Sequence, residues 1–255
     1  MDADRRPSDH PAADSHAAVR RAAVSATLAH SHRDTEPWQI VVQPDALHLY
    51  ADPDRWLLST DPTGQALTLS VGCALLNARA SLETQGVGHE VLRFPDPRRP
   101  QHVATILVTG EWSRPGAGAR SALARLGAGG AGRHTVDATR SRLPRSDEIE
   151  VLTAAVKAED ARLHLLGPDV VAVATSGNRA WDWLVAGEAV QRLVLEAAGL
   201  GLAVAAVDGW LASPADRARL RDQIGGEDHP QAVLQLGAPG RTIRGRRRSL
   251  ATVLH

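Results

Sequence analysis

The residues best suited to hold a charged ligand are arginines near the end of the chain. Arg241, Arg244, Arg246, Arg247 and Arg248 form the densest basic cluster in the sequence. A guanidinium group binds phosphate through planar, paired hydrogen bonds, so the cluster indicates a phosphate clamp. A solvated, partly disordered tail is the plain alternative. RNA binding is a third interpretation, but the cluster lacks the interleaved aromatic residues and the basic surroundings of RNA-binding domains.

Outside this arginine cluster, the sequence gives little support for catalysis by side chains. Cys73 stands among apolar residues in a helical pattern without a clear basic neighbour, which indicates a packed thiol rather than a nucleophile. His30 and His32 would need further ligands to make a metal site. The glycines of Gly199-Leu-Gly201 follow a helix and precede a strand, the reverse of a phosphate-binding glycine loop. We therefore expect neither a metal site nor a catalytic side chain.

Composition limits the class of partner and the compartment. The chain has 29 Lys and Arg against 29 Asp and Glu, so its net charge of zero creates no overall field for nucleic acid or an anionic membrane. A single cysteine in 255 residues rules out an internal disulfide and fits a reducing compartment. The first ten residues lack the apolar run of a secretory signal. We expect a cytoplasmic protein with a small-molecule partner.

Apolar periodicity and turn residues predict interleaved helices and strands, which places the chain in the mixed α and β class. Helices are expected at residues 15–30, 61–85, 146–160, 180–199 and from 213 onward. Strands are expected at residues 38–42, 46–50, 89–94, 102–109, 161–166, 169–175, 202–207 and 231–237.

The two long helices suggest an internal duplication. Gly72 and Gly86 bracket one helical segment, and Gly187 and Gly201 bracket another of equal length. Each is followed by an apolar strand and later by a strand that ends in glycine, which predicts two similar halves with a site between them. The expected divisions are a disordered N-terminus at 1–14, a first half at 15–112, a linker at 113–132 and a second half at 133–255 with a basic tail.

Several segments, taken in order, resemble the nitroreductase superfamily, most closely its actinobacterial Acg-like branch with two fused halves. The family's flavin loop, Pro-Ser-x-His-Asn-Thr-Gln-Pro-Trp, is similar to residues 30–38, and its Arg-Arg/His-Ser/Thr motif is similar to residues 133–135. The long helix Asp-Trp-Leu-x-Ala-Gly-x-Ala is matched at residues 182–189. The closing segment with its basic tail is similar to residues 230–237 and 246–247.

The resemblance implies a fold, a cofactor and a reaction. The fold would be α+β, a central and mostly antiparallel sheet flanked by long helices. FMN would lie between the halves and pass reducing equivalents from NADH or NADPH to a nitroaromatic or quinone-like acceptor, in a monomer or homodimer. The cofactor-binding residues implied are Ser31, Arg33, Asp34, Arg133, His134, Thr135, Asp208, Gly209, Arg246 and Arg247.

Departures from the family pattern leave an alternative open. Asp34 and Glu36 stand where the pattern has Asn and Gln, and Asp137 stands where it has a basic residue near the flavin. A unit charge ~4 Å away contributes on the order of 4 kcal/mol at an effective dielectric constant of 20, so such acids would disfavour reduced flavin unless Arg33, Arg140 or Arg142 compensates. The alternative is a non-enzymatic relative that binds or sequesters flavin, or acts through a protein interface.

Overall fold

The computed structural model describes residues 11–113, 133–136, 142–207, 211, 213–243 and 247–255, with side chains outside 11–13, 133–136 and 241–243. The helices are α1 (Pro11–Ala26), α2 (Gln65–Gln85), α4 (Ser146–Lys157), α5 (Ala180–Gly199) and α6 (Pro214–Gln223). The strands are β1 (Trp38–Val42), β2 (Ala46–Ala51), β3 (Val87–Arg93), β4 (His102–Trp112), β5 (Arg133–Val136), β6 (Arg162–Leu165), β7 (Val170–Thr175), β8 (Ala203–Ala206), β9 (His229–Gly237) and β10 (Pro239–Ile243).

The two halves repeat one topology. In the first half, α1, β1, β2, α2, β3 and β4 follow in sequence, and the strands lie in the order β1-β2-β4-β3. In the second half, α4, β6, β7, α5, β8 and β9 follow in sequence, and the strands lie in the order β6-β7-β9-β8. Every pairing within these two sheets is antiparallel. The predicted duplication therefore holds at the level of topology, with α6 as an insertion between β8 and β9.

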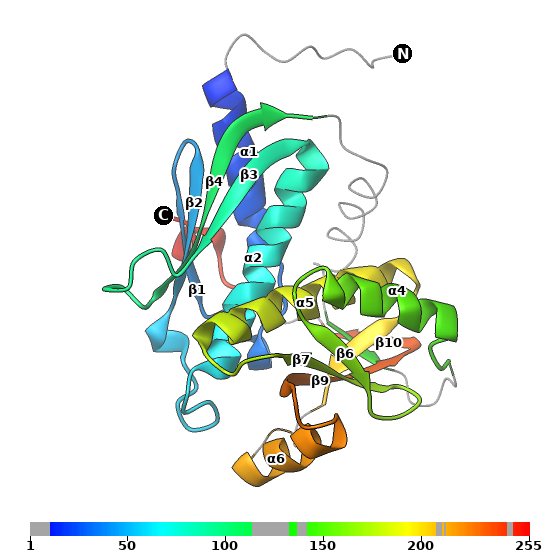
Figure 1. The fold of residues 1–255 in the computed structure, drawn as a ribbon. Helices are drawn as coiled ribbons and strands as arrows, with labels where there is room; N and C mark the ends of the chain where they lie inside the picture. The colour runs from blue at the N-terminus through cyan, green and yellow to red at the C-terminus, as the bar shows by residue number, and fades with distance from the viewer. Residues whose placement is uncertain (1–10, 114–132, 137–141, 208–210, 212, 244–246) are drawn as a thin grey trace, which may run out of the picture.

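The halves meet through their long helices. Helix α2 packs on the first sheet, α5 packs on the second, and α2 and α5 pack against each other between the sheets (Figure 1). One buried apolar cluster runs through all of these elements. The described strands form two four-stranded sheets and a separate β5–β10 pair, rather than one central sheet. Among the helices described, none is both long and apolar enough to cross a lipid bilayer.

Glycine allows α2 and α5 to approach at their crossing. A Cβ added to Gly187 would overlap the carbonyl oxygen of Leu69 and lie 2.9 Å from the Cα of Gly72. A Cβ added to Gly72 would overlap the carbonyl oxygen of Leu184 and lie 3.0 Å from the Cα of Gly187. The Leu69 carbonyl stands three residues before Gly72, and the Leu184 carbonyl stands three residues before Gly187. Each helix therefore contacts the other in the same way, as two copies would across a twofold axis.

Ion pairs surround this crossing and are nearly removed from water. Glu188 of α5 has a side chain only 1% exposed and contacts Arg79 of α2 at 2.6 Å and Arg93 of β3 at 2.8 Å. Arg79 also contacts Glu159 at 2.7 Å, and Glu159 contacts Arg192 of α5 at 2.8 Å. Loss of hydration raises the pKa of Glu188, and the Arg79 and Arg93 guanidinium groups oppose that shift. Removing one partner would leave a buried charge without its counterion.

The last residues close the first sheet. The Ile40 N–H donates to the Val253 carbonyl at 2.9 Å, and the Val42 N–H donates to the His255 carbonyl at 2.8 Å. The Ile40–Leu254 bridge is parallel, and Val253 is buried. The end of the second half therefore covers the β1 edge, which would otherwise offer unpaired backbone groups.

Most predicted elements are confirmed, and the residues 180–199 predicted for the second long helix are those of α5. Helix α2 begins at Gln65 rather than at 61, because Gly64 has φ of +75° and cannot lie inside a right-handed helix. It ends at Gly86 as expected, where φ is +71°. Residues 11–14, expected to be disordered, belong to α1.

Strands β5 and β10 were not predicted. The proposed linker lies, apart from Ser113, outside the described residues. The boundaries proposed for the two halves stay predictions.

Replacing Gly187 with Ala tests the helix crossing. Ala normally stabilises a helix relative to Gly by about 1 kcal/mol, but here the added methyl group would force the helices apart. We expect Gly187→Ala to lower the free energy of unfolding by about 2–3 kcal/mol in urea titrations, or to abolish cooperative unfolding. Gly167→Ala is the matched control, because its Cβ would meet only the Val170 Cβ at 4.0 Å. Equal stability of the two variants would contradict the crossing described.

Candidate functional site

The loop at residues 31–36 has the most unusual backbone among the described residues. Arg33, Asp34 and Glu36 all have positive φ, at 50°, 55° and 46°. Side chains with a Cβ rarely adopt this conformation, and when they do the surrounding structure must hold them there. Strain of this kind gathers at ligand-binding sites, so the loop is the first place to look for one.

Helices α2 and α5 hold this loop close to their crossing. The His32 N–H donates to Ser70 Oγ of α2 at 3.0 Å, and the His30 N–H donates to Gln191 Oε1 of α5 at 3.2 Å. Within the loop, the Glu36 N–H donates to Ser31 Oγ at 3.1 Å. The loop thus lies where the two halves meet, as the duplication predicts for a shared site.

The tail reaches the same loop. Arg247 Nη1 lies 3.4 Å from Glu36 Oε1, and the Arg248 N–H donates to Glu36 Oε2 at 2.9 Å. The structure therefore brings Arg247 of the predicted site to the loop that contains Ser31, Arg33 and Asp34.

Arg247 contacts protein groups on both sides of its guanidinium. Its guanidinium donates to the carbonyls of Thr27 at 2.8 Å, Ala29 at 2.9 Å and Leu28 at 3.1 Å, in the segment that follows α1. An arginine at a helix C-terminus satisfies unpaired carbonyls and complements the helix dipole. Arg247 therefore binds the carbonyls just after α1 and is a counterion for Glu36; its expected contact with phosphate stays a prediction.

The second-half motif at residues 133–135 lies on β5, which pairs with β10. Arg133 pairs with Ile243 and His134 pairs with Thr242, so β5 lies beside the strand that leads into the tail. Thr135 follows on the same strand. The predicted residues Asp208, Gly209 and Arg246 lie outside the described residues, as do Asp137 and Arg140.

A small open pocket adjoins the loop. The space inside it is enough for about one water molecule, far less than a small-molecule site needs. It is lined by residues of the loop, of the segment that precedes α2 and of the first turn of α2, namely His32, Thr35, Arg55, Leu57, Asp61, Ala66 and Leu67.

In the structure, Glu36 and Arg142 both have partners within the protein. Glu36 is buried and ion-paired with Arg247, so its charge is compensated by protein groups. Arg142, considered as a substitute near the flavin, donates to the Gly201 carbonyl at 2.6 Å and to Glu148 at 2.6 Å, and so caps the end of α5. Asp34 remains an exposed acid on the loop.

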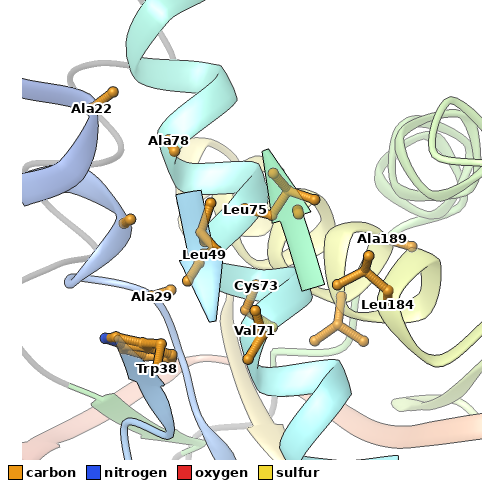
Figure 2. Close-up of a cluster of buried hydrophobic side chains, with 14 of the residues drawn as sticks. Ala22, Ala29, Trp38, Leu49, Val71, Cys73, Leu75, Ala78, Leu184 and Ala189 are labelled. Atoms are coloured by element: carbon orange, nitrogen blue, oxygen red, sulfur yellow. The ribbon is translucent and has the colours of Figure 1, made fainter. Parts of the chain in front are cut away.

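Trp38 and Cys73 belong to the apolar core, and Trp183 lies closer to the surface. Trp38 is fully buried, as expected of a core residue, whereas Trp183 is only partly buried and donates to Asn178 Oδ1 at 2.8 Å. Figure 2 shows Cys73 on α2 in the apolar cluster that also holds Val71 and Leu184. Among the described residues, no group of three or more His, Cys, Asp or Glu side chains could hold a metal ion.

Sequence reasoning missed the polar groups that hold the site together. Glu188, Glu36 and Asp52 are buried acids, each contacting an arginine distant in the chain. Gln231 of β9 bonds Gln65 of α2 and also donates to Thr175 Oγ1 at 2.8 Å, linking the halves below the loop. Apolar periodicity gives no sign of such pairs, because each partner alone looks like an ordinary surface residue.

Comparison with known proteins finds relatives in Mycobacterium tuberculosis (strain ATCC 25618 / H37Rv). The chain is 43% identical over 88 residues to "Putative NAD(P)H nitroreductase Rv3131", a match that covers 34% of this chain and 26% of that protein. It is 32% identical over 88 residues to "Putative NAD(P)H nitroreductase acg", covering 34% and 27%. The matches thus span about a quarter of the length of these curated relatives. No family model matches the chain.

A solved structure has the same fold. The crystal structure of "a putative nitroreductase" from Anabaena variabilis ATCC 29413 superposes with a TM-score of 0.58 at 11% identity, over 76% of this chain and 69% of that one. At this identity the likeness concerns the fold alone. It confirms the expected α+β architecture.

The thiol of Cys73 gives a direct test of the packing beneath the site. Cys73 is 1% exposed, its Sγ donates to the Gly187 carbonyl at 3.3 Å, and burial raises its pKa to about 12. Since only the thiolate reacts, alkylation by iodoacetamide at pH 8 should be about 10³-fold slower in the native protein than in urea. The single cysteine makes the measurement unambiguous. A native rate close to the unfolded rate would refute this placement of Cys73.

Proposed function

We propose that the chain is an Acg-like member of the nitroreductase superfamily and a flavin-dependent NAD(P)H oxidoreductase; its similarity to the Mycobacterium relatives and its fold support this. FMN would lie between the halves, beside loop 31–36. NADH or NADPH would be the reductant, and a nitroaromatic or quinone-like molecule would be the acceptor. The protein would act as a monomer or homodimer, without nucleic acid or membrane.

One observation carries this proposal. The strained loop and the end of the basic tail meet beside the crossing of α2 and α5, although they are far apart in the chain. A strained loop beside arginines from the other half is a suitable arrangement for a large anionic ligand shared by both halves.

The residue types at the predicted positions suit a flavin phosphate and ring. Arg133, His134, Thr135 and Arg246 would hold the phosphate through charge-assisted hydrogen bonds. Ser31, Arg33 and Asp34 would meet the ring from the first half, and the backbone at Asp208-Gly209 would approach it closely. Bound FMN would supply the hydride-transfer chemistry. The acid at Glu36 does not oppose this fit, because Arg247 already neutralises it.

Flavin uptake is the first test. The purified protein should bind added FMN, retain it through gel filtration and oxidise NADPH or NADH when a nitroaromatic acceptor is present. Arg133→Ala should weaken FMN binding about 10- to 100-fold, the usual loss for a hydrogen bond to a charged group.

The control and the contradicting result are both clear. Arg98→Ala removes the same charge from a side chain that is 96% exposed on the turn between β3 and β4, so FMN affinity should stay the same. A wild-type protein that takes up no FMN would refute the proposed function and leave the fold unaffected.

A second candidate is a relative that binds or sequesters flavin without turnover. Arg247, expected among the phosphate ligands, contacts Glu36 and the carbonyls that follow α1, and the pocket beside the loop is small. This candidate predicts FMN binding without NAD(P)H oxidation. Steady oxidation with a nitroaromatic acceptor would eliminate it.

A further inference from the structure

Glu36 is the point where the tail grips the loop at residues 31–36. Its side chain is buried, yet both carboxylate oxygens meet the tail, Oε2 at the Arg248 N–H at 2.9 Å and Oε1 at Arg247 Nη1 at 3.4 Å. Its own carbonyl accepts from Arg248 Nη1 at 3.0 Å. Two successive arginines therefore contact one acid at the end of a strained segment.

Arg248 connects this acid to the first sheet. Its side chain is 11% exposed, and Nη1 also reaches the Trp38 carbonyl at 3.1 Å and Asp52 Oδ2 at 3.2 Å. Asp52 is itself buried and accepts from Gln39 Nε2 at 2.8 Å. The ion pairs thus join the tail to the strand that directly follows the loop.

The loop needs such external contacts. Three residues with side chains have positive φ at 33, 34 and 36, a conformation that the chain does not keep without outside support. Helix α2 holds the first part of the loop through His32, and α5 holds His30 just before the loop. At Glu36, the contacts to Arg247 and Arg248 hold its other end.

We propose that Glu36, Arg247 and Arg248 are positioning residues, an ion-paired clasp by which the tail of the second half holds loop 31–36 in its flavin-facing shape. This proposal rests on the proposed function of the same site. It reverses the simple interpretation of the sequence, in which an acid at 36 in place of the family's Gln damages the flavin site. The acid is one half of the clasp, and the family residue at this position would break it.

Two amide substitutions on the same loop separate these interpretations. Glu36→Gln should weaken FMN binding at least about tenfold, because small displacements of a binding group carry large losses. Asp34→Asn, which removes the same charge from an exposed side chain of the loop, should tighten FMN binding. Fluorescence titration with FMN measures both. Tighter binding by both variants would overturn the clasp and support the simple interpretation.

A second measurement does not depend on flavin. In protein without FMN, amide hydrogen exchange at residues 35 and 36 should accelerate at least about tenfold in Glu36→Gln, because Thr35 N–H and Glu36 N–H are bonded inside the loop. Arg248→Gln should accelerate it similarly, and the double variant should add little to either single one. Additive effects, or unchanged exchange, would refute the clasp.

The outcomes distinguish the two proposals. If wild-type protein takes up no FMN, the proposed function fails while hydrogen exchange still tests the clasp. If wild-type protein binds FMN and Glu36→Gln binds it equally well with unchanged exchange, the clasp fails and the function stands. Should Glu36→Gln not fold, Arg247→Gln at a 33% exposed side chain gives the same comparison with a smaller expected loss.

Discussion

The close contact of Gly72 with Gly187 is the constraint on which the rest of the structure depends. Each sheet is attached to one of the two crossing helices, so the spacing of these helices sets the spacing of the halves. The candidate site inherits this geometry. The His32 N–H of the loop bonds Ser70, which stands two residues before Gly72. The His30 N–H, just before the loop, bonds Gln191, which stands four residues after Gly187. A change in helix spacing would therefore move the two sides of the site relative to each other.

The two halves keep one topology but differ in charge next to the crossing. Cys73 follows the first glycine and is an apolar, unionised thiol, whereas Glu188 follows the second and is held by two arginines of the other half. Since a buried ion pair adds specificity more readily than stability, this asymmetry would favour one arrangement of the halves over other ways of stacking two similar units.

Local signals in the sequence were enough to predict most helices and strands. They were not enough to predict which distant segments contact each other. Helix α5 followed from apolar periodicity, and Gly86 correctly marked the end of α2. The start of α2 was predicted too early, at residue 61, because Gly64 takes a left-handed backbone conformation and the helix begins only after it. The site was harder to predict, because pairing between Glu36 and Arg247 depends on which distant segments meet. Comparison with the flavin-loop pattern cannot reveal this pairing, since it shows only that Glu36 stands in place of Gln.

The pairing of Ile40 with Leu254 has a consequence for the order of folding. During synthesis, β1 emerges from the ribosome early, and the segment that covers its edge emerges after β9 and β10 have been made. For most of translation the first sheet thus has an open edge, a surface on which unrelated chains can add strands. Contacts so distant in sequence also form slowly once synthesis is complete. Expression at lower temperature or with chaperones should accordingly matter more for this chain than for one whose sheets close locally.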